Sequence, residues 1–291
     1  MRLSAKLPES FWQNWVEVIL QRYAFAVEFD GRAYKGWQTQ QAGVISVQET
    51  LEQAFSRVAN HRVAVHGAGR TDAGVHASGM IAHFDSDAPR AIRNWLMGVN
   101  SCLPESISVR WIVPVDENFH ARFKATSRRY NYIIYNHPHR SSLLAGRATW
   151  HYQPLNVDLM AAAAASLVGV HDFNAYRSVA CQSNRPVRDV HFLHVEQQGP
   201  LIRLDIQADG FLHHMVRNIA GVLLAIGEGK APVSWASEVL AGRDRTLGGV
   251  TAPPDGLYFV HAGYDLPGLT LPADTLGPSW LAAWPLNKVS S

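Results

Sequence analysis

Apolar residues recur along the chain with two different spacings, which predict strands and helices in a definite order. From Tyr23 to Phe29 every second residue is a large apolar one, as in a strand with one buried face. Across Val47–Ala59 the apolar residues instead form one stripe at helical spacing. Further on, the pattern gives apolar runs at 61–65 and 80–84, a helical stretch at 89–99 and a strand at 107–115. The first half therefore predicts the order β-α-β-β-α-β.

The second half repeats this order with additions. A strand pattern around Tyr130–Ile134 precedes an alanine-rich helix over Val157–Val168. The remaining expected elements are strands at 187–195 and 201–206, helices at 212–226 and 234–240, and a strand at 258–260. Together the halves predict an α+β fold of two ferredoxin-like domains, the split β-α-β arrangement that RNA-recognition modules also use. We expect their sheets to flank a central basic cleft.

The same pattern gives the expected domain boundaries. We assign residues 22–117 to an N-terminal domain and residues 118–265 to a C-terminal domain. Residues 1–21 read as an amphipathic extension, because their apolar residues fall at helical spacing. Residues 266–291 contain only Asp274 and Lys288 as charged groups, so we assign them to a tail that is packed on the surface or mobile.

The amino-acid composition excludes several classes of protein. With 291 residues, 47% of them hydrophobic, the chain can bury a sizeable core and is not disordered over most of its length. Its two cysteines exclude a disulfide framework and a zinc site with four thiolates. The longest largely apolar stretch, Met160–Val170, is well short of the roughly 20 residues that span a bilayer. We find no secretory signal pattern and expect a cytoplasmic protein without a membrane segment.

Positive charge is concentrated in one segment, although the formal net charge is only +2. From Asn118 to Val157 there is no acidic residue, and aromatic rings alternate with basic groups. The basic residues of this stripe are Arg122, Lys124, Arg128, Arg129, Arg140 and Arg147. Basic groups among aromatic rings suit a phosphate backbone with exposed bases, whereas a solvated basic strand and loop is the plainer alternative.

A glycine-rich segment carries the strongest candidate for chemistry. Residues 67–77 read GAGRTDAGVHA, which predicts a tight exposed loop between two strands. The segment is not a phosphate-binding loop, because Val75-His76 follows where Lys-Ser or Lys-Thr is required. Asp72 is then a carboxylate flanked by Arg70 and His76, able to act as nucleophile or base. A turn aspartate that binds its own backbone is the alternative.

Five ordered motifs together resemble the tRNA pseudouridine synthase A (TruA) family. The string GRTDAGVHA at 69–77 is the signature of that family. The other four are FDG…GWQ at 29–38, FHARF…RRYNY at 119–132, ADGFLHHMVRN at 208–218 and PDGLY at 254–258. The first has Phe29 where tyrosine is commoner. The resemblance covers about residues 22–264 and leaves the extension and the tail outside.

The resemblance implies a function and a set of roles. It implies isomerisation of uridine to pseudouridine at positions 38–40 of the tRNA anticodon stem-loop, without metal or organic cofactor, by a homodimer in which one tRNA contacts both subunits. Asp72 would be the catalytic carboxylate, Tyr130 would stack on the target uracil, and Arg217 would pair with Asp72. Arg70 would help expel the target base. We add Arg122, Lys124, Arg128 and Arg129 of the basic stripe as candidate RNA-binding residues.

The chemistry is consistent with these residue types. The reaction breaks the C1′–N1 bond, turns the base and joins C5 to C1′, and a carboxylate can attack the sugar, attack the ring or remove a sugar proton. Arg217 shares a row of its predicted helix with His213 and Gly221, away from the apolar stripe, so it can face a cleft. An exposed helix charge is the alternative for Arg217, and plain sheet core is the alternative for Tyr130.

The 14 histidines raise the question of a metal site. No HExxH motif is present, and the adjacent His213 and His214 are expected on different faces of a helix. Surface or RNA-contacting histidines are therefore favoured. Two other classes of function stay open. A non-catalytic RNA-binding protein would keep all its activity in Asp72→Asn, and a metal-dependent hydrolase would hold stoichiometric metal.

Overall fold

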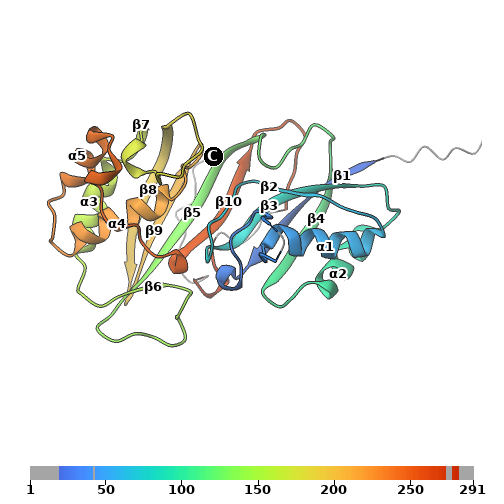
Figure 1. The fold of residues 1–291 in the computed structure, drawn as a ribbon, viewed down its shortest axis with the longest axis horizontal. Coiled ribbons are helices and arrows are strands. Elements are labelled where there is room, and N and C mark those ends of the chain that lie inside the picture. Colours follow the sequence, from blue (N-terminus) through green and yellow to red (C-terminus); the bar gives the residue numbers. More distant parts are fainter. Residues whose placement is uncertain (1–19, 42, 273–276, 282–291) are drawn as a thin grey trace, which may run out of the picture.

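The computed structural model describes residues 20–41, 43–272 and 277–281, which form one mixed α+β body. Its described strands make a ten-stranded sheet in the order β4-β1-β3-β10-β5-β9-β8-β7, with β2 beside β3 and β6 beside β5 (Figure 1). The amphipathic extension expected at 1–21 lies almost wholly outside the described residues. The presence of both helices and a mixed sheet confirms the predicted α+β class.

The N-terminal half follows the predicted order of elements. They are β1 (Gln21–Phe29), α1 (Val47–Ala59), β2 (Val65–Gly67), β3 (His76–Ser86), α2 (Ile92–Cys102) and β4 (Ile107–Val115). Ser46 caps α1 by accepting a hydrogen bond from the backbone N–H of Glu49, and Asn60 ends it in the left-handed conformation. The four strands are antiparallel neighbours in the order β4-β1-β3-β2.

The C-terminal half contains the expected elements and two short strands that the pattern did not predict. They are β5 (Ala125–Asn136), β6 (Thr149–His151), α3 (Val157–Ala165), β7 (Gly169–Asp172), β8 (Val187–Gln198), β9 (Leu201–Ala208), α4 (Met215–Gly227), α5 (Trp235–Gly242) and β10 (Leu257–Tyr264). Four of these strands repeat the order of the first half, as β10-β5-β9-β8. The unpredicted β6 and β7 have only three and four residues, too few to establish a period.

The two halves share one continuous sheet, which differs from the expectation of two sheets that flank a cleft. The last strand, β10, pairs in parallel with β3 through Tyr258 opposite His76 and Phe259 opposite Ala77. On its other side β10 pairs antiparallel with β5. The parallel pairing begins at His76, directly after the loop that carries Asp72. The junction therefore places the glycine-rich loop at the centre of the molecule.

Alternate residues of the central strands face two different cores. Tyr132 of β5 and Phe259 of β10 belong to the main core, together with residues of α1 and α4. Ile133 and Val260 face the other way, into a smaller cluster that includes Leu281. The helices thus pack on one face of the sheet, α1 and α2 toward one end and α3 to α5 toward the other (Figure 1).

Parts of the predicted tail are described. Leu266, Leu269 and Leu271 are partly buried against the main core, and Leu281 lies in the smaller cluster. These segments are packed on the body, while residues 282–291 lie outside the described part. Across the described ranges, no helix combines the length and apolar character needed to cross a bilayer.

Candidate active site

A cleft lies over the junction of the two halves. It is a cavity of about 1260 Å³ lined by the glycine-rich loop, by Tyr130 of β5 and by the segment that leads into α4. Basic side chains in its wall are Lys35, Arg70, Arg122, Arg128, Arg188 and Arg217. A concave site with convergent charges where two structural units meet is a common location for substrate binding. The loop bearing Asp72 and the start of α4 thus come from different halves and meet here.

Backbone contacts hold the loop of Asp72 in place. A Cβ on Gly31 would lie 1.9 Å from the carbonyl oxygen of Val75, and a Cβ on Gly36 would lie 2.5 Å from that of Thr71. Gly36 also has φ +95°, which favours glycine. Glycine at positions 31 and 36, in the motif at 29–38, therefore allows this segment to lie in direct backbone contact with the loop of Asp72.

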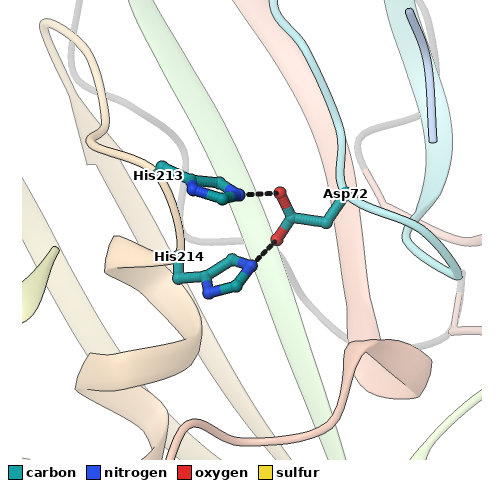
Figure 2. Close-up of side chains that lie close together, drawn as sticks. All are labelled: Asp72, His213 and His214. Carbon is teal, nitrogen blue, oxygen red and sulfur yellow. Dashed lines mark ion pairs between the residues drawn. The ribbon is translucent and has the colours of Figure 1, made fainter. Parts of the chain in front are cut away.

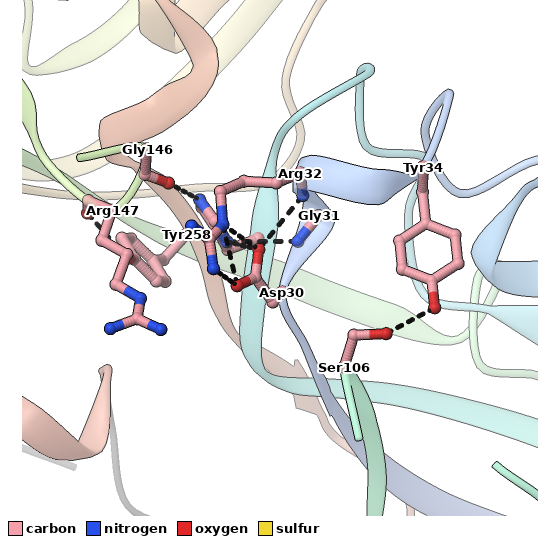
Figure 3. A network of polar contacts seen from close by, with 9 residues as sticks. Asp30, Gly31, Arg32, Tyr34, Ser106, Gly146, Arg147 and Tyr258 are labelled. Atoms are coloured by element: carbon pink, nitrogen blue, oxygen red, sulfur yellow. Dashed lines mark hydrogen bonds and ion pairs between the residues drawn. The ribbon is translucent and has the colours of Figure 1, made fainter. Parts of the chain in front are cut away.

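His76 ties the same loop to two other segments. Its Nδ1 accepts a hydrogen bond from the backbone N–H of Gly31 at 3.1 Å, and its Nε2 donates to the carbonyl of Gly146 at 2.9 Å. Burial lowers the pKa of His76, so the ring stays neutral and can make both contacts. Figure 3 shows this region, where Arg32 also pairs with Asp30. The histidine of the signature thus has a structural role in this fold.

Asp72 and Arg217 are brought together as the resemblance implied. Nη1 of Arg217 donates to Oδ2 of Asp72 at 3.1 Å, across a separation of 145 residues in sequence. Nε of the same guanidinium donates to the carbonyl of Ala252 at 2.8 Å, which fixes its orientation. A guanidinium held at two points can in turn hold the carboxylate in one direction.

His213 and His214, both in the motif at 208–218, also face Asp72, contrary to the sequence-based expectation. Nε2 of His213 lies 3.3 Å from Oδ1 of Asp72, and Nε2 of His214 lies 3.3 Å from Oδ2 (Figure 2). The expectation assumed a helix through residues 212–226, but α4 begins at Met215. His214 has φ +63°, and this left-handed turn brings the two rings to one side, with centroids 4.0 Å apart.

Charge and burial around His214 act on its protonation in opposite directions. Burial lowers its pKa, the nearby Asp72 carboxylate raises it, and the neighbouring His213, Arg217 and Arg245 lower it. The net shift is downward, so the neutral imidazole is favoured at neutral pH. The sequence contained a signal for this pair, because two adjacent histidines lie beside the apolar stripe of the predicted helix and fit no core position.

Tyr130 lies in the wall of the cleft with little exposed surface. Its ring packs edge-on against Phe211 and Phe259, with centroids 5.0 and 5.1 Å away. Burial, followed by the negative charge of Asp72, raises the pKa of its phenol well above 10. The side chain is therefore a neutral, firmly held aromatic group in the same cavity as Asp72.

The four candidate RNA-binding residues and Arg70, the residue expected to expel the target base, differ in their surroundings. Arg70 and Arg122 are exposed and line the cleft, and Lys124 is exposed outside its lining. Arg128 lines the cleft but donates to the backbone carbonyls of Ala68, Ala125, Asp209 and Arg122, so it joins segments of the protein. Arg129 is only 2% exposed and forms an ion pair with Asp205 at 2.5 Å. This enclosure does not agree with RNA binding by Arg129, whose side chain alternates to the opposite face from Tyr130.

Comparison with known proteins agrees with the motifs. The family model described as tRNA pseudouridine synthase matches residues 25–124 and 163–265. The chain is 54% identical over 262 residues to "tRNA pseudouridine synthase A" of Acinetobacter baumannii (strain AYE), covering 90% of this chain and 98% of that protein. It is 55% identical over 260 residues to the protein of the same name from Aeromonas hydrophila subsp. hydrophila, covering 89% and 96%. The chain therefore belongs to the tRNA pseudouridine synthase A family, isomerases that convert uridine to pseudouridine in tRNA.

Proposed function

We propose that the chain modifies uridines 38–40 of the tRNA anticodon stem-loop and that Asp72 is its essential carboxylate. The observation that carries this proposal is the meeting of Asp72 and Arg217 in one cleft from opposite halves of the molecule, at 3.1 Å. A carboxylate oriented by a fixed guanidinium, beside a cavity that can admit a nucleotide, is the arrangement that the isomerisation needs. The side chain of Asp72 is 22% exposed, so substrate can reach it.

The target base must leave the helical stack before Asp72 can reach it. Arg70 is exposed and lies two residues before Asp72 on the same loop, and we assign to it the role of expelling the base. Tyr130 then offers its ring to the extruded uracil, and such stacking contributes about 1–3 kcal/mol per base. The charge of Asp72 acts on the phenol of Tyr130, which supports a site in which both act on one nucleotide.

The reaction is an internal rearrangement that needs only proton transfer and a leaving base that stays bound. The C1′–N1 bond breaks, the uracil turns, C5 joins C1′, the C5 proton is lost and N1 gains a proton. Attack on the sugar, attack on the ring and removal of a sugar proton all require a carboxylate beside the extruded nucleotide. Because no step oxidises or reduces the substrate, we propose that the enzyme works without an organic cofactor or a required metal.

The remaining parts of the proposal concern assembly. We propose a cytoplasmic homodimer in which one tRNA contacts both subunits. We also propose that residues 22–117 and 118–265 are two ferredoxin-like domains joined through β3 and β10. The matching strand orders β4-β1-β3-β2 and β10-β5-β9-β8 support this division.

The position of modification can be tested by mapping pseudouridine in a transcribed tRNA treated with the purified protein. We expect product at uridines 38–40 and none in a tRNA whose uridines at those positions are replaced by cytidine. Product elsewhere in the tRNA, with these positions untouched, would contradict the proposed site. Light-scattering mass, measured with and without tRNA, tests the homodimer separately.

A further inference from the structure

Three potential metal ligands meet in the cleft. We propose that Asp72, His213 and His214 bind a divalent transition-metal ion such as Zn²⁺, and that a metal bound there blocks the isomerase. The proposal of binding depends only on the geometry of the three side chains. The proposal of inhibition depends in addition on the catalytic role assigned to Asp72 above.

The distances suit a tetrahedral ion. Neighbouring ligand atoms in such a site, with bonds of about 2.0–2.1 Å, are roughly 3.3 Å apart. Oδ1 of Asp72 lies 3.3 Å from Nε2 of His213, and the three side chains offer ligand atoms that all lie within 4.8 Å of one another. Imidazole nitrogen and carboxylate oxygen are both ligands that Zn²⁺ takes, with a water in the fourth position.

Backbone contacts fix the main chain of the two histidines. The left-handed conformation of His214, at φ +63°, is costly for a residue with a side chain, yet it turns two consecutive rings toward one point. The carbonyl of His213 accepts a hydrogen bond from Ser178 at 2.8 Å, and that of His214 accepts one from Asn218 at 2.9 Å. A ligand pair fixed at the start of a helix loses little freedom when a metal binds.

The positive charge of Arg217 disfavours a metal cation at this site. Its Nη1 contacts Oδ2 of Asp72, and this leaves Oδ1 as the oxygen on the side of His213. The side chain of His213 is 40% exposed, so an ion can enter from the cleft. A metal on Oδ1 would occupy the carboxylate that the proposed reaction uses and would fill the space into which the nucleotide must come.

Binding can be measured without activity, by titrating the metal-free full-length protein with Co²⁺ and following its visible absorption. We expect one equivalent to bind to wild type, and His213→Ala, His214→Ala and Asp72→Asn each to lose about 10-fold or more in affinity. The matched control replaces His137 and His139, a second close pair of histidines in another loop, by alanine. It should bind as wild type does. Far-ultraviolet circular dichroism confirms that each variant is folded.

Two results would overturn the site. One is Co²⁺ binding that is unchanged in all three variants, and the other is binding that is lost only in the control. At tRNA concentrations well below KM, Zn²⁺ should also lower turnover of tRNA, with half-inhibition at its own binding constant and full recovery on addition of EDTA. Stoichiometric binding without inhibition would refute the blocking role. If wild type bound metal but never turned over tRNA, the function proposed above would fail while the metal site stood.

Discussion

Gly31→Ala tests whether the first motif positions the catalytic loop through backbone contact. The added Cβ would lie 1.9 Å from the carbonyl oxygen of Val75, whereas real Cβ contacts stay at 3.0 Å or more, so the two segments must separate by about 1 Å. The N–H of Val75 binds the carbonyl of Asp72 at 3.2 Å, so a shift of Val75 is passed on to Asp72. A misplacement of about 1 Å costs on the order of 10²-fold in rate.

We therefore expect kcat to fall by about 10²-fold in Gly31→Ala while KM for tRNA changes little, because the exposed basic residues of the cleft are untouched. Steady-state kinetics on a transcribed tRNA give kcat and KM, and a thermal melt gives the change in stability. The control is Gly199→Ala, in the turn between β8 and β9, where φ is +57° and no atom lies within 4 Å of the new Cβ. It should cost about 1 kcal/mol of stability and no activity.

One result would contradict this reasoning: a Gly31→Ala variant that melts at a lower temperature but keeps its kcat. In that case the segment of Gly31 would move instead of the loop, and the position of Asp72 would not depend on this contact.

Four further changes have distinct expected outcomes. Arg217→Lys keeps the charge but loses the second anchor on Ala252, so kcat should fall on the order of 10²-fold, measured at saturating tRNA. Replacing Arg122 and Lys124 by alanine should weaken tRNA binding and reduce its logarithmic salt slope by about 1 for each phosphate group that is no longer neutralised. Arg129→Ala should leave that slope unchanged and cost about 3–5 kcal/mol in urea unfolding, because Asp205 loses its buried partner. Burial, then the nearby charges of two other histidines, lowers the pKa of His83 from 6.5 to about 3, so the unfolded chain takes up a proton that the folded chain excludes. Stability should be complete above pH 6.5 and fall by up to about 1.4 kcal/mol per pH unit below it, a slope that His83→Asn should reduce in urea unfolding at pH 7 to 5.

Periodicity was sufficient for the long elements, because each has one face in the core. Helix α1 and strand β4 begin and end where the pattern indicated, at Val47–Ala59 and Ile107–Val115. The parallel pairing of β3 with β10 could not be predicted from the sequence, since it joins residues some 180 positions apart through only two pairs, Tyr258 with His76 and Phe259 with Ala77. Local pattern carries no information on such pairings.

The candidate site was predictable in its motifs and less so in its side-chain directions. Asp72 and Arg217 meet as the family resemblance implied. His214 escaped prediction because one positive φ moves the start of α4 and reverses the direction of a ring. Arg129 was misjudged for a related reason, since a strand places neighbouring side chains on opposite faces and a cluster of charge in sequence need not be a cluster in space.

Release of tritium from C5 of uridine shows whether Asp72 carries out the isomerisation. A transcribed tRNA with tritium at C5 of its uridines is incubated with wild type or Asp72→Asn, in the presence of EDTA and without cofactor, and tRNA affinity is measured for both. We expect tritium to be released to water by wild type alone, with nearly equal affinities. Release by Asp72→Asn at the wild-type rate would contradict the catalytic role of this carboxylate.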